Sequence, residues 1–222
     1  MPVVFKEEIV RRLRGSGVVA VVTLPDAERA VPLGRALLAG GISMIELTLR
    51  TPVALEALTR LKREMPELLV GAGTVLSPAD LQAARAAGAD FAVSPGVNRR
   101  VLEEAERTGF SFAPGVATPS DIETALEYGC RMLKFFPTEP IGGLPYFRAV
   151  TAPYEHLGLQ YIPLGSLNEQ LLPAYLERPT VAAIGGTWMA TGELIAGEQW
   201  DKITALSRQA SELARRVRGA SS

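Results

Sequence analysis

Residues 44–50 of the chain read Met44-Ile45-Glu46-Leu47-Thr48-Leu49-Arg50, an alternation with a period of two. This period is typical of a β-strand, whose successive side chains point to opposite faces. One face carries the apolar side chains Ile45, Leu47 and Leu49, and the other carries Glu46, Thr48 and Arg50. Since strands of parallel α/β folds are covered on both faces, we expect the apolar face to meet helices and the polar face to point inward.

Strand-like runs and helical patterns alternate along the whole chain. The expected strands cover residues 18–23, 44–49, 69–74, 91–94, 111–113, 132–136, 160–163 and 181–184. Between them, pairs such as Ser77-Pro78 and Thr118-Pro119 precede stretches with helical spacing of apolar residues. Eight strand–helix units predict an α/β fold of the closed (β/α)8 (TIM) barrel type, formed by a single domain over residues 1–222. The pattern of residues 1–15 predicts an extra N-terminal helix that closes the barrel floor.

An open nucleotide-binding sheet is the fold that the sequence excludes. Such a sheet needs a glycine fingerprint after its first strand, and residues 18–25 contain none. The triplet Gly71-Ala72-Gly73 lacks the third glycine of the fingerprint, because Leu76 stands in its place. We therefore interpret the triplet as a tight strand end and not as a cofactor loop.

The composition limits the class of partner. The chain is 47% hydrophobic and 21% charged with a formal net charge of −1, so no global field attracts nucleic acid or anionic membranes. A lone Cys130 and the lack of any membrane-length apolar run favour the cytoplasm. The single histidine, His156, stands in a polar stretch that is typical of a surface loop. We expect a small-molecule partner and no multi-histidine metal site.

One of the four lysines stands inside an apolar strand. Lys134 lies within Met132-Leu133-Lys134-Phe135-Phe136, whereas the other three occupy charged helical patterns, where we expect solvent exposure. Burial disfavours an ammonium ion, so we expect a usable fraction of free amine near neutral pH, and a free amine attacks ketones to form imines. The charged strands therefore favour a reactive Lys134 beside Glu46. A purely structural ion pair between the two stays the alternative.

Further residues fall at the expected barrel mouth, where this fold holds its active sites. Arg50, Thr74 and Ser94-Pro95 end successive strands, and the last two are individually more typical of strand-end turns. Glycine turns follow the last two strands, as Leu164-Gly165-Ser166 and Gly185-Gly186-Thr187. Glycine lets backbone N–H groups approach an anion, and a following helix N-terminus adds a favourable dipole. Together the two turns predict a phosphate site.

Taken in order, these segments resemble the 2-keto-3-deoxy-6-phosphogluconate (KDPG) and 4-hydroxy-2-oxoglutarate (KHG) aldolase family over nearly the whole chain. The stretches that carry the resemblance are residues 45–51, 70–75, 94–96, 114–118, 133–137 with 142–143, and 184–188. It implies a class I, Schiff-base lyase on a (β/α)8 barrel that needs neither a metal nor an organic cofactor. It also implies a place in carbohydrate metabolism, in the Entner–Doudoroff pathway, and a homotrimer.

The resemblance assigns a role to each candidate residue. Lys134 matches the Schiff-base lysine, and Glu46 matches the general acid/base. Arg50 and Thr74 match residues that hold the substrate carboxylate, while Pro95 and Phe136 match residues that line the pocket. The residues that match the phosphate-binding ends of the last two strands are Gly165, Ser166, Gly185, Gly186 and Thr187.

One departure concerns the phosphate. Phosphate-using relatives typically have Thr-Gly-Gly-Ile after the seventh strand, where this chain has Leu164-Gly165-Ser166-Leu167. The exchange removes one hydroxyl and one glycine beside the expected anion, although Ser166 can supply a hydroxyl of its own. We therefore expect weaker discrimination in favour of a phosphorylated substrate.

The expected reaction releases pyruvate and an aldehyde from a 2-keto acid. The aldehyde is glyceraldehyde 3-phosphate if the substrate is KDPG, and glyoxylate if it is 4-hydroxy-2-oxoglutarate. Two alternatives stay open. One is a sugar-phosphate isomerase or epimerase on the same barrel, which would use Glu46 for proton abstraction and form no covalent adduct. The other is a paralogue that binds keto acids without turnover.

Overall fold

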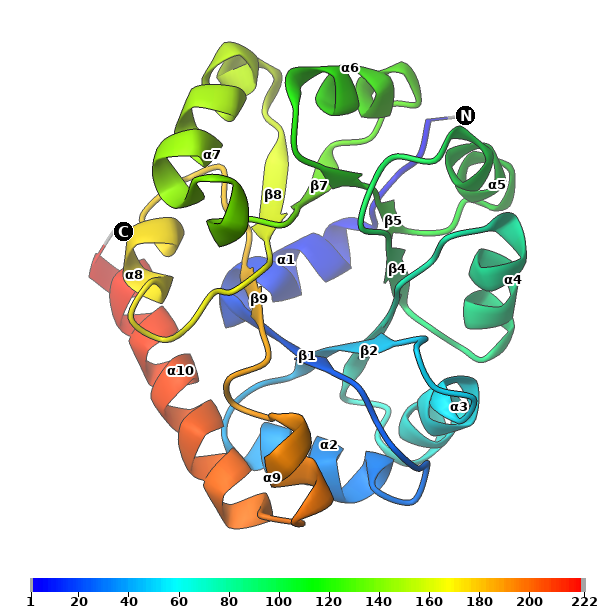
Figure 1. The fold of residues 1–222 in the computed structure, drawn as a ribbon, viewed down its shortest axis with the longest axis vertical. Coiled ribbons are helices and arrows are strands. Elements are labelled where there is room, and N and C mark those ends of the chain that lie inside the picture. Colours follow the sequence, from blue (N-terminus) through cyan, green and yellow to red (C-terminus); the bar gives the residue numbers. More distant parts are fainter. Residues whose placement is uncertain (1, 221–222) are drawn as a thin grey trace.

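Short parallel strands surrounded by helices form the centre of the chain in a computed structural model, which describes residues 2–220 (Figure 1). The strands are β1 (Val18–Val22), β2 (Met44–Thr48), β3 (Leu69–Gly73), β4 (Phe91–Val93), β5 (Phe112–Ala113), β6 (Gly115–Val116), β7 (Met132–Phe135), β8 (Gln160–Pro163) and β9 (Ile184–Gly186). A six-stranded sheet has the order β5-β4-β3-β2-β1-β9, and a three-stranded sheet has the order β6-β7-β8. The pairs within both sheets are parallel, which confirms a curled parallel α/β arrangement.

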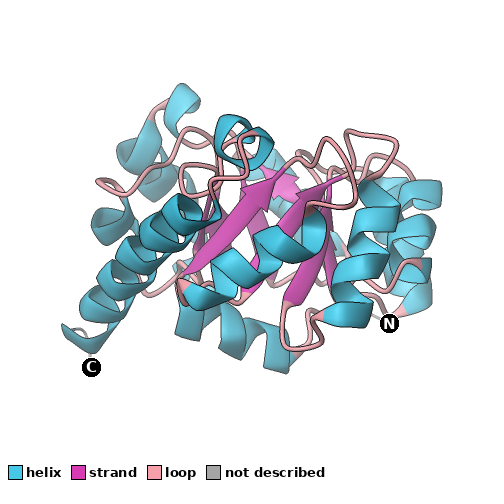
Figure 2. Cartoon of the chain, turned by 90° about the horizontal axis from the view of Figure 1, so that it is seen from below, coloured by secondary structure: helices cyan, strands magenta, loops and turns pink. Residues whose placement is uncertain are grey.

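Helices cover the outer sides of the strands (Figure 2). They are α1 (Glu7–Ser16), α2 (Ala30–Ala39), α3 (Ala54–Glu64), α4 (Pro78–Ala86), α5 (Arg99–Thr108), α6 (Pro119–Glu127), α7 (Gly143–Thr151), α8 (Leu172–Leu176), α9 (Gly192–Ala196) and α10 (Trp200–Ala220), with the short 3-10 helices η1 (Glu139–Ile141) and η2 (Ala152–Leu157). The starts of α4 and α6 are as predicted, because Ser77 and Thr118 each form a capping box with an aspartate three residues on. Within residues 2–220, none of these helices combines the length and the apolar character that crossing a lipid bilayer requires.

Backbone hydrogen bonds join the two sheets on both sides. On one side, β5 continues through Pro114 into β6, and the carbonyl of Pro114 accepts from the N–H of Lys134 at 2.9 Å. On the other side, Tyr161 of β8 forms a parallel bridge with Val181, and its carbonyl accepts from the N–H of Ala182 at 2.8 Å. These bonds connect β7 and β8 to residues that adjoin β5 and β9 of the six-stranded sheet.

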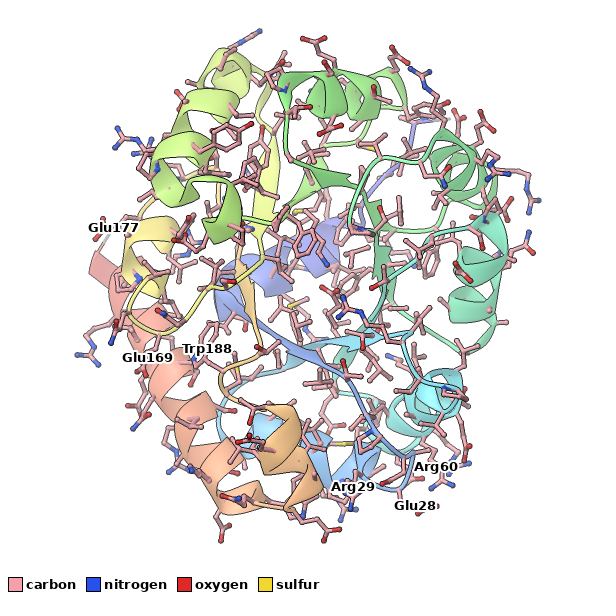
Figure 3. All side chains as sticks on the ribbon, in the orientation of Figure 1. Glu28, Arg29, Arg60, Glu169, Glu177 and Trp188 are labelled. Atoms are coloured by element: carbon pink, nitrogen blue, oxygen red, sulfur yellow. The ribbon has the colours of Figure 1, made fainter. Side chains whose placement is uncertain are left out.

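Two strands differ from the sequence-based expectation. The fifth expected strand, 111–113, has a second half, β6, beyond Pro114, a residue that has no N–H to donate to a ladder. The last strand begins later than expected and includes Gly185 and Gly186, so the predicted turn at these glycines was wrong. Both glycines are needed for packing: a Cβ at Gly185 would lie 2.3 Å from Cδ1 of Leu164. Trp188, which is labelled beside the end of β9 in Figure 3, covers Gly186 in the same way.

Buried side chains form two clusters that follow the alternation along the strands. Outward residues such as Ile45, Leu47 and Phe135 pack with the helices, as the sequence predicts. A second, inner cluster contains the following members: Phe5, Ile9, Leu13, Val19, Val21, Met44, Leu69, Phe91, Val93, Ala113, Met132, Ile162, Leu164, Ala182 and Ala183. The inner faces of β2, β3 and β7 therefore start apolar at their amino ends, with Met44, Leu69 and Met132.

Helix α1 lies across these amino ends. Its Leu13 is fully buried in the inner cluster together with Ile9. Arg12 Nη2 donates to the carbonyl of Glu67, just before β3, at 2.6 Å, and Arg14 Nε donates to Gln160 Oε1 of β8 at 3.1 Å. Polar contacts at its edge and apolar contacts beneath it fix α1 against this side of the strands, which leaves their carboxyl ends as the open side.

Candidate active site

A buried ion pair lies at the centre of the inner face. Lys134 on β7 donates from Nζ to Oε1 of Glu46 on β2 at 2.8 Å, and the two side chains are 7% and 4% exposed. Gly73 on β3 makes room for the carboxylate, because a Cβ there would lie 2.5 Å from Glu46 Oε1. The predicted contact between amine and carboxylate is confirmed. The glycine triplet forms the end of β3, as predicted, and it also allows close packing.

An aromatic ring completes the surroundings of the amine. Lys134 Nζ lies 5.5 Å from the ring centroid of Phe136, a distance at which a cation is attracted to the π face. Met132 lies on the same strand face, one pleat toward α1, and is buried. The amine therefore pairs with one carboxylate and lies over one aromatic ring. A single proton transfer to Glu46 would leave both groups neutral, and a neutral amine is a nucleophile.

The ion pair opens into a cavity of about 340 Å³ at the carboxyl ends of the strands. Each of the predicted site residues lines it: Glu46, Arg50, Thr74, Pro95, Lys134, Phe136, Gly165, Ser166, Gly185, Gly186 and Thr187. The cavity is also lined by residues that were not predicted as site residues: Val21, Pro137, Pro140, Leu164 and Leu167. Val21 could have been found by extending the period of two from β2 to β1. The prolines lie in a connection whose path only the folded chain defines.

Arg50 and Thr74 lie side by side at one edge of the cavity. Arg50 Nε donates to Thr74 Oγ1 at 3.4 Å, and the arginine side chain is otherwise exposed. This leaves guanidinium N–H groups available for a carboxylate, which a guanidinium can bind through two parallel hydrogen bonds. Thr48 points inward as predicted but is capped by Thr23, with 2.7 Å between the hydroxyl oxygens. Ser94 donates to the carbonyl of Gly96 at 2.7 Å and so has a turn-forming role.

The opposite edge of the cavity is formed by the turns after β8 and β9. Gly165 and Ser166 have φ values of 109° and 58°, so Ser166 is a non-glycine residue in the left-handed region. No backbone hydrogen bond within residues 2–220 uses the N–H of Ser166 or of Thr187. These two amides and the two hydroxyls are donors that an anion could accept from.

The expected helix N-termini directly behind these turns are not found. Helix α8 begins at Leu172 and α9 at Gly192, several residues beyond Ser166 and Thr187, and each helix has five residues. Between Ser166 and the start of α8, the chain forms a local turn in which Asn168 Oδ1 accepts from the N–H of Leu171 at 3.1 Å. The helix dipole expected at these turns is therefore not supplied by α8 or α9, and the candidate donors to an anion are the N–H groups and hydroxyls of Ser166 and Thr187.

Other ionisable groups lie away from this cavity. His156 is exposed on η2, as expected for a solvated side chain. Lys62 was expected in solvent, but its side chain is 21% exposed and lies 2.7 Å from Asp90. Burial raises the pKa of the Cys130 thiol to about 12. Figure 3 labels Glu28, Arg29 and Arg60 together at the lower edge of the view, where Arg60 pairs with Glu28 at 2.7 Å.

A buried lysine beside a carboxylate, at the carboxyl ends of parallel strands, defines a candidate enzyme with a lysine nucleophile. The family model of KDPG and KHG aldolase matches residues 9–206, so the chain belongs to this family. The chain is 42% identical over 206 residues to the 2-dehydro-3-deoxy-phosphogluconate aldolase of Treponema pallidum (strain Nichols), which covers 93% of this chain and 96% of the relative.

Two solved structures share the fold. The KDPG aldolase of Legionella pneumophila, with pyruvate captured at low pH as a covalent carbinolamine intermediate, has a TM-score of 0.87 and 38% identity, covering 91% of this chain and 97% of its own. The 2-keto-3-deoxy-6-phosphogluconate aldolase of Zymomonas mobilis ZM4, with 3-phosphoglycerate, has a TM-score of 0.83 and 37% identity, covering 93% and 95%. The family expected from the sequence is confirmed.

Proposed function

We propose that this chain is a Schiff-base aldolase that cleaves KDPG to pyruvate and glyceraldehyde 3-phosphate, 4-hydroxy-2-oxoglutarate to pyruvate and glyoxylate, or both. The observation that carries the proposal is the buried Lys134 amine, 2.8 Å from Glu46, inside a 340 Å³ cavity. A structural ion pair has no need of an adjoining cavity. An amine that forms an imine needs both the cavity and a proton acceptor.

The first half of the reaction joins the substrate to the enzyme. Lys134, after passing a proton to Glu46, attacks the C2 carbonyl carbon to form a carbinolamine. Glu46 returns a proton to the C2 hydroxyl, which leaves as water, and a protonated imine remains. Arg50 and Thr74 hold the carboxylate on C1, so that the keto carbon stays next to the amine.

The second half breaks the carbon–carbon bond. Glu46 removes the proton of the C4 hydroxyl, the C3–C4 bond breaks, and its electron pair passes into the imine to give an enamine while the aldehyde leaves. C3 of the enamine is protonated, water adds to the resulting imine, and pyruvate is released. The water lost in the first half is regained here, and Lys134 returns to its starting state. Pro95 and Phe136 line the apolar wall beside the reacting carbons.

The far end of the substrate is assigned to the turn at Gly165-Ser166 and to the carboxyl end of β9 at Gly185, Gly186 and Thr187. Their N–H groups and hydroxyls suit a phosphate, and the aldolase of Zymomonas mobilis has been crystallised with 3-phosphoglycerate. Relative to a Thr-Gly-Gly-Ile stretch, Leu164 supplies no hydroxyl and Ser166 has a Cβ where a glycine has none. We therefore propose that phosphorylated and unphosphorylated substrates are less sharply discriminated than in relatives with two glycines here.

Finer features of the protein belong to the same proposal. The eight strand positions, with β5 and β6 as one, would form a closed (β/α)8 barrel whose floor is covered by α1, in one domain over residues 1–222. Membership of the family supports a homotrimer and a cytoplasmic enzyme that needs neither a metal nor an organic cofactor. Light scattering of the purified chain tests the trimer, and a monomer would contradict it.

Borohydride trapping tests the function itself. With pyruvate present, reduction should add one pyruvyl group to Lys134, which blocks tryptic cleavage there and yields a single peptide of residues 132–148. An isomerase or epimerase would form no adduct with pyruvate. A binding paralogue would be trapped but release no pyruvate from KDPG or 4-hydroxy-2-oxoglutarate. An adduct on Lys6, Lys62 or Lys202 would also contradict the proposal.

A further inference from the structure

A hydrogen bond behind the cavity wall connects η1, which follows β7, to α8, which follows β8. Tyr175, on α8, is fully buried, and its hydroxyl donates to Oε1 of Glu139 at 2.6 Å. This separation is in the range of strong, charge-assisted O–H···O⁻ hydrogen bonds. Neither side chain lines the cavity. The proposed mechanism has no use for either residue.

Glu139 lies in the connection that follows the strand of Lys134. Its backbone N–H donates to the carbonyl of Gly165 at 3.2 Å, and the preceding Thr138 donates to the carbonyl of Leu164 at 2.7 Å. These bonds fix the loop after β7 to the loop after β8. The contact is close, because a Cβ at Gly165 would lie 2.9 Å from the nitrogen of Thr138.

The carboxylate of Glu139 also lies against the start of α7. A Cβ at Gly143, whose φ is 60°, would be 3.0 Å from Oε2 of Glu139. Phe147 on α7 in turn contacts the ring of Tyr175 with 6.1 Å between centroids. Helices α7 and α8 follow one another around the outside of the strands (Figure 1). Both therefore contact Glu139, α7 at Gly143 and α8 through the hydroxyl of Tyr175.

We propose that Glu139 and Tyr175 are positioning residues that set the distance between the Lys134 amine and the Gly165–Ser166 turn. Through this distance they govern recognition of the phosphate end of the substrate and leave imine formation unaffected. The inference rests on the proposed aldolase function. It predicts that removing the Tyr175–Glu139 hydrogen bond weakens binding of the distal phosphate. The donors of the Gly165–Ser166 turn would then no longer be held at a fixed distance from the substrate end that is bound to Lys134.

The decisive variant is Tyr175→Phe, which keeps the buried ring and removes the hydroxyl. We expect KM for KDPG to rise about tenfold, the lower end of what a hydrogen bond to a charged group contributes. The kcat value and the rate of borohydride trapping with pyruvate should stay within about twofold of wild type, because pyruvate does not reach the turn. Tyr161→Phe is the matched control, since Tyr161 is equally buried and its hydroxyl has no hydrogen-bond partner within residues 2–220.

Changes at Glu139 provide the second arm. Glu139→Ala should raise KM for KDPG as Tyr175→Phe does, while Glu139→Gln, which retains an acceptor oxygen for the tyrosine, should restore most of the affinity. Glu139 is only half-buried, so this arm remains informative if Tyr175→Phe folds poorly. An unchanged KM in both Tyr175→Phe and Glu139→Ala would overturn the positioning role. So would equal losses in pyruvate trapping, because the pair would then act on the amine.

The wild-type protein separates this inference from the function on which it rests. If wild type is not trapped by borohydride with pyruvate, the aldolase proposal and the positioning role both fail. If wild type is trapped and turns over KDPG, but the variants bind it normally, only the positioning role fails.

Discussion

The inner faces of β2 and β7 carry opposite chemistry at their two ends. At the amino end, Met44 and Met132 are 0% and 2% exposed and pack with Leu13 of α1. Two residues further along each strand, Glu46 and Lys134 are almost equally buried, at 3% and 6%, but carry charge. Burial alone therefore does not separate structure from function in this molecule. What separates them is the free-energy cost of burying a charge. The amino ends of the strands bury only apolar side chains here, whereas the carboxyl ends bury a charged pair in spite of this cost.

The largest effect that tests this contrast is on catalysis. Lys134→Met keeps much of the side-chain volume and removes the nucleophile, so kcat should fall at least about a thousandfold. Pyruvate release from KDPG, followed in a coupled assay, measures it. Lys62→Met is the control, since Lys62 pairs with Asp90 outside the cavity, and should keep full activity. Appreciable turnover by Lys134→Met would rule out the proposed nucleophile.

The next effect concerns stability at the mouth. Lys134→Met leaves the Glu46 carboxylate buried without its cation, and the free energy of unfolding should fall by about 3–5 kcal/mol. The double variant Lys134→Met/Glu46→Gln buries no charge and should recover most of this loss while staying inactive. Urea denaturation at pH 7 compares the two. If the double variant is as unstable as the single one, the ion pair is needed by the fold itself.

A change at the amino ends of the strands should lower stability but leave kcat nearly unchanged. Met132→Ala removes packing from the inner cluster one pleat away from Lys134, and should cost about 2–4 kcal/mol of unfolding free energy. Its kcat for pyruvate release, assayed below the melting transition, should stay within about threefold of wild type because this end of the strands serves stability. A large fall in kcat with normal folding would show that floor and mouth are not independent.

The smallest effect is expected at a buried group with no assigned chemistry. Burial raises the pKa of Cys130 from 9.0 to about 12, and the thiolate is the reactive form. Iodoacetamide at pH 8 should therefore leave native Cys130 unmodified and label it after unfolding, as mass spectrometry would detect. Because the folded pKa is raised, the thiol's contribution to stability is complete below pH 9 and is lost as pH rises toward 12. Rapid labelling of the native protein would contradict this.

Much of the site could be predicted because it depends on short-range regularities. The alternation in residues 44–50 assigns Glu46 to the inner face, and an isolated charge in an apolar run identifies Lys134. Parallel strands then bring residues 88 positions apart into one hydrogen bond. The N-termini of α4 and α6 were predictable for a similar reason, since a capping box needs residues only three positions apart.

The features that were missed depend on distant neighbours. Gly185 and Gly186 resemble a turn in sequence, but they lie in β9, where Leu164 and Trp188 occupy the space that a Cβ would need. The pairing of Lys62 with Asp90 joins residues 28 positions apart, and a helical pattern alone gives no reason to expect it. Similarly, the link from Tyr175 to Glu139 depends on where α8 begins.

The sequence by itself determined the alternation of strands and helices, the inward direction of Glu46 and Lys134, and the family to which the chain belongs. These follow from periodicities of two and 3.6 residues and from the cost of placing charge in an apolar strand. Only the tertiary structure decided the 2.8 Å contact, the shape of the cavity, the N–H donors at its far edge and the buried tyrosine behind it. Such features arise from packing between elements far apart in the chain, where side-chain volume and hydrogen-bond geometry set the distances.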